Sequence, residues 1–204
     1  MREEKRQARM TEIETEAYAL FDALGFEGTS MLALAKRAKA SNETLYRWYG
    51  DKHGLFESMV RANAAQVRAQ LTQAAEGQAD PLTRLAKLAP VLLGMLLGPR
   101  AIALNRAAAT DPTGALGQLL AKGGREDVLP LIRALLSQAI SEGQLKPPQN
   151  GDIGGVFMHL LVGDQQIRRV IGTMAAPTED EVAEKAKVAL AQFTALCTSA
   201  APAP

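Results

Sequence analysis

The sequence predicts an all-α fold, with a small three-helix N-terminal domain followed by a larger helical bundle. Apolar residues recur at helical spacing in most segments, and no segment of useful length alternates with the period of two that marks a β-strand. The 204 residues are 47% hydrophobic and 22% charged, a composition typical of packed globular proteins. A chain of this length can bury one good core or two modest ones.

The first expected helix is amphipathic and ends at a glycine. Its apolar positions lie three or four residues apart between Ile13 and Leu24, with charged residues on the other face. Gly25, followed by Phe26, fits a left-handed helix cap with its hydrophobic contact. We therefore expect the chain to leave the helix at Gly25.

Two short helices separated by a brief turn are expected next. Thr29 and Ser30 can cap a helix whose apolar side ends at Ala38. Ser41 can cap a second helix that runs from about Asn42 to Tyr49. Two helices joined by a turn of three or four residues form the helix-turn-helix arrangement.

The later helices are separated by Gly and Pro signals. A connecting helix is expected from Asp51 to about Ala75, leaving the small domain and entering the larger one. Thr178 and Glu181 have the spacing of a capping box at the start of the last helix. The other helices are expected at residues 81–97, 100–110, 115–122, 125–142 and 151–171, with the last at 178–198.

Positive and negative charges are unevenly distributed, although the net charge of the chain is only +1 at pH 7. Residues 28–68 contain more Lys and Arg than Asp and Glu, whereas residues 1–27 contain more acidic residues. A local excess of positive charge suits a surface that meets phosphate groups. The sequence therefore favours nucleic-acid binding near the two short helices.

No segment indicates secretion or membrane insertion. The longest nearly apolar run, residues 89–98, has about half of the roughly 20 residues that a bilayer-spanning helix needs. The N-terminus is charged and carries no apolar signal core. We therefore expect a cytoplasmic protein without a membrane partner.

Metal, cofactor and enzyme signatures are also missing from the sequence. One cysteine and two histidines cannot supply a four-ligand zinc site, and Cys197 has no second cysteine to pair with. The sequence has no His-Glu-x-x-His motif, no Gly-x-Ser-x-Gly motif and no glycine-rich phosphate loop after a strand. We expect neither a cofactor nor a metal, and we do not expect an enzyme.

The first 60 or so residues carry a set of spaced positions without gaps: Ala19-Leu20-Phe21, Gly25-Phe26, Thr29-Ser30, Leu34-Ala35, Ala38, Ser41, Thr44-Leu45-Tyr46, Tyr49, Lys52 and Leu55-Phe56. This pattern closely resembles the DNA-binding domain of the tetracycline-repressor (TetR) family. The resemblance implies a transcription regulator, most often a ligand-responsive repressor, that binds a pseudo-palindromic operator in double-stranded DNA as a homodimer. In this sequence Lys39 replaces the family's usual glycine, and Ala40 replaces its usual valine.

The resemblance divides the chain and places the DNA contacts. It implies a helix-turn-helix DNA-binding domain at residues 1–56, a helical effector-binding and dimerisation domain at 57–198, and a disordered tail at 199–204. It makes the helix from Asn42 to Tyr49 the recognition helix, whose first residues read base edges in the major groove. The implied DNA-binding residues are Thr29, Ser30, Ser41, Asn42, Glu43, Thr44, Tyr46, Arg47, Trp48 and Lys52.

These residues have different expected roles. Asn42, Glu43 and Thr44 are the base-reading candidates, although Glu43 could equally be solvated or cap its own helix. The resemblance implies phosphate contacts for Tyr46 and Lys52, and the amides of a helix N-terminus favour such a contact at Thr29 and Ser30 as well. Arg47 is an exposed cation. Trp48 either touches the DNA or covers the seam between the first and fourth helices.

In the C-terminal part the resemblance is one of layout, and it implies a dimer interface and a pocket for a small hydrophobic effector. The implied interface residues are Phe157, Leu161, Val182, Ala186, Ala189 and Phe193. The implied pocket residues are Leu92, Met95, Leu96, Asn105, Arg106, Met158 and His159. The methionines could instead fill the core, His159 could be a satisfied core histidine, and Arg106 could form an ordinary salt bridge.

One alternative keeps the helices but not the DNA: a helical protein-interaction module without DNA binding. The two functions differ in one simple property. A DNA-binding protein has an affinity for duplex DNA that falls steeply with salt, because its cations release counterions from the phosphates.

Overall fold

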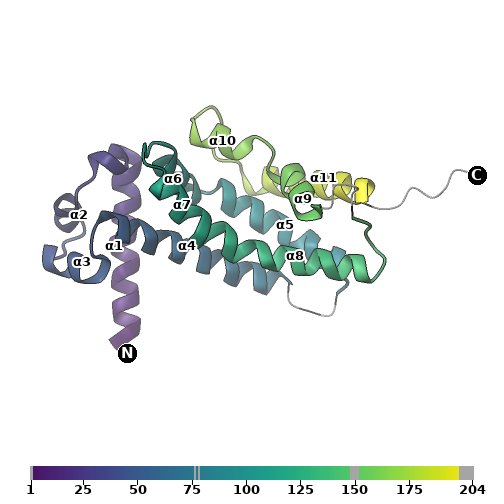
Figure 1. Cartoon of the computed structure of the whole chain (residues 1–204), viewed down its shortest axis with the longest axis horizontal. Coiled ribbons are helices and arrows are strands. Elements are labelled where there is room, and N and C mark those ends of the chain that lie inside the picture. The colour runs from purple at the N-terminus through teal and green to yellow at the C-terminus, as the bar shows by residue number, and fades with distance from the viewer. Residues whose placement is uncertain (1, 76, 78, 148–151, 198–204) are drawn as a thin grey trace, which may run out of the picture. The chain divides into compact units, whose positions relative to one another are not determined.

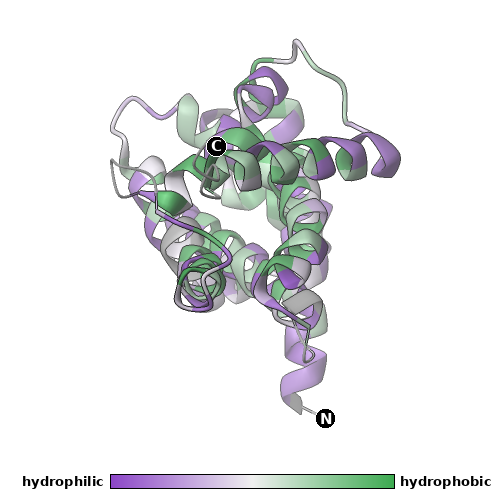
Figure 2. Cartoon of the chain, turned by 90° about the vertical axis from the view of Figure 1, so that its right-hand side faces the viewer, coloured by the Kyte–Doolittle hydropathy of each residue, from purple (hydrophilic) through white to green (hydrophobic). Residues whose placement is uncertain are grey.

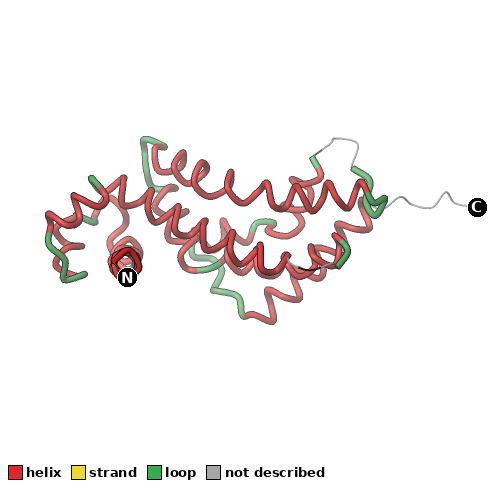
Figure 3. The backbone as a smooth tube through the Cα atoms, turned by 90° about the horizontal axis from the view of Figure 1, so that it is seen from below, coloured by secondary structure: helices red, strands yellow, loops and turns green. Residues whose placement is uncertain are grey.

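The computed structural model describes residues 2–75, 77, 79–147 and 152–197, and all regular elements in these ranges are helical (Figures 1 and 3). The elements are α1 (Arg2–Gly28), α2 (Met31–Arg37), α3 (Asn42–Tyr49), α4 (Lys52–Ala75), α5 (Pro81–Leu97), α6 (Pro99–Ala109), α7 (Ala115–Leu120), the π-helical turn η1 (Ala121–Arg125), α8 (Glu126–Ser141), α9 (Ile153–Val162), α10 (Gln165–Val170) and α11 (Glu179–Cys197). The all-α prediction is confirmed. The tail expected at 199–204 lies outside the described residues.

The chain packs as two compact units, and each is described by itself. The first unit contains Met1–Ala64 and Arg100–Arg125, and the second contains Ala65–Pro99 and Glu126–Pro204. Helix α4 starts in the first unit and ends in the second, as expected for a connecting helix. The packing units are thus not continuous in sequence. The expected domain boundary at residue 56 stays a prediction.

Phenylalanine rings and aliphatic side chains from α1 to α4, α6 and α7 form the core of the first unit. The Phe26 ring lies 5.4 Å from that of Phe21 and 5.8 Å from that of Phe56, measured between ring centroids. Leu104 of α6 and Leu116 of α7 are fully buried in the same cluster. These apolar contacts explain why residues 100–125 pack with the N-terminal helices.

Gly25 ends the regular part of α1, as the sequence predicted. Its φ of 72° and ψ of 171° interrupt the helix, which continues for one short turn to Gly28. A side chain with a Cβ is strained in this backbone region, whereas glycine adopts it readily. The N-terminal turns of α1 are hydrophilic (Figure 2).

The second unit has its own apolar core, in which α11 packs against α5 and α9, and α8 packs against α5. The rings of Phe157 and Phe193 meet edge to face at its centre, with centroids 5.3 Å apart. Asp80 caps α5, accepting hydrogen bonds from Leu82 N and Thr83 N at 3.1 Å each. The predicted capping box of α11 is present, since Glu181 N donates to Thr178 Oγ1 at 3.2 Å and Thr178 N to the Glu181 carboxylate at 2.7 Å.

One expected helix is divided in the structure. The sequence predicted a single helix over residues 151–171, but α9 ends at Val162 and α10 begins at Gln165. Gly163 between them has a φ of 54°, which takes the backbone out of the right-handed helical region. Residue 151 lies outside the described residues.

The six residues expected at a dimer interface lie inside the second unit. Phe157, Leu161, Val182, Ala186, Ala189 and Phe193 are all buried in its core. The structure therefore corrects this assignment, because these side chains form the inward faces of α9 and α11. Among the residues that the structure describes in this unit, the large apolar side chains that are exposed are Ile167, Ile171, Val188 and Leu196.

In the part of the chain that the structure describes, no single helix is both long and apolar enough to span a membrane. Helices α5 and α6 reach that length and composition only when they are taken together across a bend.

Gly25→Ala should destabilise the first unit by about 1–3 kcal/mol, because a Cβ is disfavoured at this φ and ψ. No neighbouring atom lies within 4 Å of the added Cβ, so backbone strain alone would cause the loss. Urea unfolding followed by the emission of Trp48, the single tryptophan, measures it. Gly117→Ala is the matched control. It also places a methyl group in open space, but inside α7, and should be neutral or stabilising.

Candidate nucleic-acid interface

Helix α3 is a short helix that is anchored on one side and capped at both ends. Leu45 is fully buried and Tyr49 nearly so, and both belong to the core of the first unit. Ser41 Oγ accepts a hydrogen bond from Thr44 N at 3.0 Å, as the sequence predicted for the N-cap. At the other end Gly50 takes a φ of 78°, and its N–H donates to Tyr46 O at 2.9 Å.

The opposite side of α3 is exposed and polar. Asn42, Glu43 and Arg47 are exposed, and Tyr46 is 50% exposed. Thr44 is half-buried, with its hydroxyl oxygen 2.8 Å from Ser41 Oγ. An amide, a carboxylate, a phenol and a guanidinium on one helix are groups that can hydrogen-bond to base edges and phosphates.

Trp48 covers part of the core beside this face. Its side chain is half-buried and packs against the apolar cluster of the first unit. The Arg6 guanidinium of α1 lies 5.9 Å from the centre of the indole ring. Glu3, Arg6, Arg47 and Trp48 together line a shallow surface hollow. Trp48 thus packs beside α1, and its contact with DNA stays a prediction.

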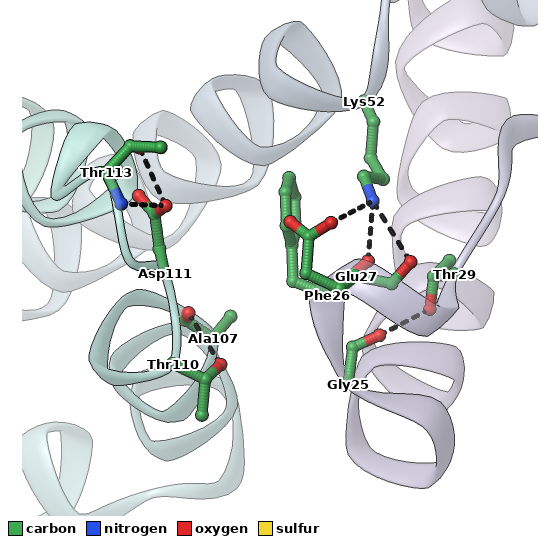
Figure 4. Close-up of polar contacts among 9 residues, drawn as sticks. All are labelled: Gly25, Phe26, Glu27, Thr29, Lys52, Ala107, Thr110, Asp111 and Thr113. Atoms are coloured by element: carbon green, nitrogen blue, oxygen red, sulfur yellow. Dashed lines mark hydrogen bonds and ion pairs between the residues drawn. The ribbon is translucent and has the colours of Figure 1, made fainter.

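The structure separates the two residues expected at the start of α2. Ser30 is exposed and caps the helix, since its Oγ accepts a hydrogen bond from Ala33 N at 3.1 Å. Thr29 is buried, and its hydroxyl donates to the carbonyl oxygen of Gly25 at 2.8 Å (Figure 4). This hydroxyl satisfies the carbonyl of Gly25, the residue that interrupts α1. The Thr29 side chain is therefore used inside the first unit, and the phosphate contact expected at this helix start stays a prediction.

Lys52 joins the start of α4 to the end of α1. Its Nζ donates to the carbonyl oxygen of Phe26 at 2.8 Å and lies 4.3 Å from the centre of the Phe26 ring. The Glu27 carboxylate is 4.0 Å away (Figure 4). A cation is favourable at the carbonyl end of a helix. Lys52 therefore stabilises this junction, and its phosphate contact stays a prediction.

Helix α6 is tied to α1 by two arginines. The Arg106 guanidinium forms a salt bridge with Asp22 at 2.7 Å. The Arg100 guanidinium lies 5.9 Å from the centre of the Tyr18 ring. Both arginines come from residues 100–125, so this segment supports the helix that packs behind the interface.

A buried carboxylate also links α1 to α4. Glu14 of α1 is 6% exposed and accepts a hydrogen bond from Ser58 Oγ of α4 at 2.8 Å. Burial raises the pKa of Glu14, while the Ser58 bond and the positive charge of Arg100 act in the opposite direction. The Glu14 carboxylate is therefore bonded to α4 and attracted by the charge of Arg100, but these interactions do not fully offset the cost of its burial.

The residues expected in an effector pocket are divided between the units. Leu92 is buried, and Met95, Leu96 and Met158 are half-buried around the core of the second unit. His159 is exposed, with Nδ1 2.7 Å from the carbonyl oxygen of Gly155.

Asn105 and Arg106 belong to the first unit. Asn105 Nδ2 donates to Ala101 O at 2.8 Å. Arg106 forms a salt bridge with Asp22, which was the alternative expected for it in place of a pocket contact. The seven residues are therefore not brought together within either unit, and these two side chains are engaged elsewhere.

Two contacts of the interface were not expected from the sequence. Arg9 of α1 donates from Nη2 to the carbonyl oxygens of Ala38 and Lys39, and Glu14 joins α1 to α4. Both contacts join residues that are far apart in sequence, so no short motif indicates them. The only local feature of the sequence that pointed to such contacts was the mixture of positive and negative charges in α1.

Two protein-family models match the chain. Residues 13–59 match the model described as bacterial regulatory proteins of the TetR family. Residues 83–199 match the model of the C-terminal domain of AefR-like transcriptional repressors. No match was found among curated protein sequences.

Solved structures resemble the whole chain. A TetR-family transcriptional regulator from Agrobacterium tumefaciens is 27% identical, with a TM-score of 0.70, and the match covers 93% of this chain and 94% of that one. A TetR-family regulator from Mesorhizobium loti is 23% identical, with a TM-score of 0.76, and the match covers 95% of this chain and 98% of that one. The transcriptional regulator FadR from Bacillus subtilis was solved in complex with stearoyl-CoA. It is 14% identical, with a TM-score of 0.71, and the match covers 90% of this chain and 97% of that one.

Glu14→Gln should change how the stability of the first unit depends on pH. Because the folded-state pKa lies above the ordinary value of 4.5, folding favours the protonated carboxyl group. The resulting stabilisation is present below pH 4.5 and is lost as the pH rises through the folded-state pKa.

Wild-type protein should therefore lose stability relative to Glu14→Gln as the pH rises from 4.5 toward neutrality. Urea unfolding at a series of pH values measures the difference. The exposed carboxylate of Glu3 supplies the control variant, Glu3→Gln, which should follow the wild-type profile. Parallel profiles for Glu14→Gln and wild type would contradict this account.

Proposed function

The chain belongs to the TetR family of DNA-binding transcriptional regulators and has an AefR-like C-terminal domain, and from this premise we propose that it is a ligand-responsive repressor. We propose that it binds a pseudo-palindromic operator as a homodimer. The observation that carries the proposal is the exposed polar face of α3, which a buried face and two caps hold in place. The family is one of regulators and not of enzymes.

In the proposed complex, α3 enters the major groove and its N-terminal residues read the base edges. Asn42 and Glu43 are exposed in the first turn of α3, and Thr44 lies beside the capping hydroxyl of Ser41. An amide matches the donor and acceptor pattern of adenine, and a carboxylate accepts from cytosine N4. Tyr46, Arg47 and the helix start at Ser30 supply contacts to the phosphates, which set the register of the helix on the duplex.

A second copy of the chain is needed for a pseudo-palindromic site, because two recognition helices must meet half-sites about 34–36 Å apart. The exposed face of α11 is a suitable surface for it. Val188, Ala191 and Ala195 are exposed and lie three or four residues apart, so they share one side of the helix. Small and branched apolar side chains on one helix face allow close packing of a partner helix. Ile167 of α10 and Ile171, the residue that follows α10, are exposed as well.

The proposed effector is a small hydrophobic compound bound by the second unit. FadR from Bacillus subtilis was solved with stearoyl-CoA, and another similar structure is described as a flavonoid-responsive regulator. Met95, Leu96 and Met158 lie at the margin of the core here and could rearrange around such a compound, since methionine is flexible and polarisable. The repressor assignment follows the description of the matching C-terminal family.

Effector binding can change DNA affinity only if the effector binds the DNA-competent and the incompetent conformations with different affinities. Helix α4 belongs to both units and is our candidate for the coupling element. Selection of bound fragments from a random duplex library tests the proposal, with a pseudo-palindrome as the expected product. Failure to retain any duplex at low salt would favour an interaction module without DNA binding.

Asn42→Ala should change the base preference at particular operator positions and reduce affinity for the selected site by about 5- to 150-fold, because one base contact is lost. The slope of log affinity against log salt should stay the same. Arg47→Ala is the matched variant for a phosphate contact. It should weaken all duplexes about equally and reduce the magnitude of that slope by about one. Fluorescence anisotropy at several salt concentrations separates the two effects.

Val188→Asp and Ala191→Asp should shift the chain from dimer to monomer in sedimentation velocity, because each buries an unpaired charge in the proposed interface. Ala183→Asp is the control. Ala183 is also an exposed alanine of α11, but it lies on a different side of the helix from Val188. An unchanged dimer in both interface variants would place the interface elsewhere.

A further inference from the structure

The turn between α2 and α3 is a helix C-cap that carries lysine at the position usually taken by glycine. Ala38 ends the helix, Lys39 N donates to Lys36 O at 3.3 Å, and Ala40 N donates to Ala35 O at 2.9 Å. These two bonds form the Schellman motif, in which the residue after the cap is left-handed. Lys39 has a φ of 49°, and it is the one non-glycine residue with a positive φ among those that the structure describes.

A lysine at this position disfavours the turn, because its Cβ crowds the backbone in the left-handed region. The bonds of the Schellman motif occupy the carbonyls of Ala35 and Lys36. The carbonyl oxygens of Ala38 and Lys39 take no part in these two bonds. The conformation of the turn therefore depends on an interaction from outside it.

Arg9 of α1 supplies that interaction. Its Nη2 donates to Ala38 O at 2.6 Å and to Lys39 O at 3.0 Å, and its Nη1 donates to the Glu12 carboxylate. Glu12 lies three residues away on the same helix and orients the guanidinium. The planar guanidinium can reach two carbonyl oxygens and a carboxylate at the same time, because its donors point in fixed directions.

We propose that Arg9 is a positioning residue for the recognition helix. By holding both turn carbonyls, it stabilises the left-handed conformation of Lys39 and fixes the position of Ser41, the N-cap of α3. The link to DNA affinity rests on the proposed function, whereas the link between Arg9 and Lys39 is a property of the folded chain. The base-reading residues Asn42 to Thr44 follow this turn directly, so a shift of the turn would misplace them.

A second arginine offers a matched comparison. Arg37 of α2 forms a salt bridge with Glu16 of α1 at 2.5 Å, so it also joins the two helices. Its partner in this ion pair is the Glu16 carboxylate, whereas the carbonyls of Ala38 and Lys39 accept hydrogen bonds from Arg9. Arg37→Met thus removes a cation and an α1–α2 contact but leaves the turn with Arg9.

The first experiment measures the coupling of Arg9 to Lys39 in thermal unfolding of the full chain without DNA. Arg9→Met should lower the melting temperature by about 4 °C, and by about half as much in the Lys39→Gly background, where the left-handed conformation is no longer strained. Lys39→Ala keeps the Cβ and removes the charge, so Arg9→Met should cause the full loss there. Arg37→Met should cause the same loss in both backgrounds.

The second experiment measures DNA affinity against salt for the same variants on the selected operator. Arg9→Met should weaken binding about tenfold without changing the salt slope, because Arg9 contacts the turn and not a phosphate. Lys39→Gly should restore part of this affinity. A slope reduced in magnitude by about one in Arg9→Met would show a direct phosphate contact and overturn the positioning role.

An equal decrease in melting temperature from Arg9→Met in the Lys39→Gly and Lys39→Ala backgrounds would also overturn the proposal. Arg9 would then not act on the left-handed conformation of residue 39. The two proposals fail in different ways. A wild-type chain that binds no duplex at low salt would refute the proposed function, and the melting experiments would still decide whether Arg9 holds the turn.

Discussion

The burial of one side of α3 is the constraint on which the rest of the interface depends. A helix of eight residues is too short to be stable in water by itself, because helix nucleation is costly and few hydrogen bonds follow it. Leu45 and Tyr49 therefore have to anchor it in the core of the first unit. The side chains that remain outside are those available to DNA.

Polar contacts over long sequence separations stabilise the scaffold around this anchor. Lys52 binds the carbonyl end of α1, Arg9 binds the turn before α3, and Arg106 pairs with Asp22. Each of these contacts joins α1 to another element. Helix α1 thus acts as the common support of the first unit, and its charged residues serve in folding as well as in the local electrostatic potential. The mixed charge of α1 alone does not reveal these partners.

The second unit illustrates how far an apolar pattern can be interpreted. The layout resemblance assigned apolar residues of α9 and α11 to a dimer interface, but the structure buries these side chains inside the unit. Val182, Ala186 and Phe193 lie in the core of the unit, and Val188 lies on the exposed side. A hydrophobic pattern identifies residues that need a partner surface. It does not say whether that surface belongs to the same chain or to a second one.

The sequence by itself determined the all-α class, the helix-turn-helix and the caps at Ser41 and Thr178, because these features arise from residues within about four positions of one another. It also indicated the exposed candidates on α3 through the resemblance of the first 60 or so residues to a known family. Only the tertiary structure decided the roles of Thr29, Lys52 and Arg9. Their partners are backbone carbonyls, and every residue carries such a carbonyl. Which carbonyl a side chain meets therefore depends on how the helices pack and leaves no mark in the local sequence.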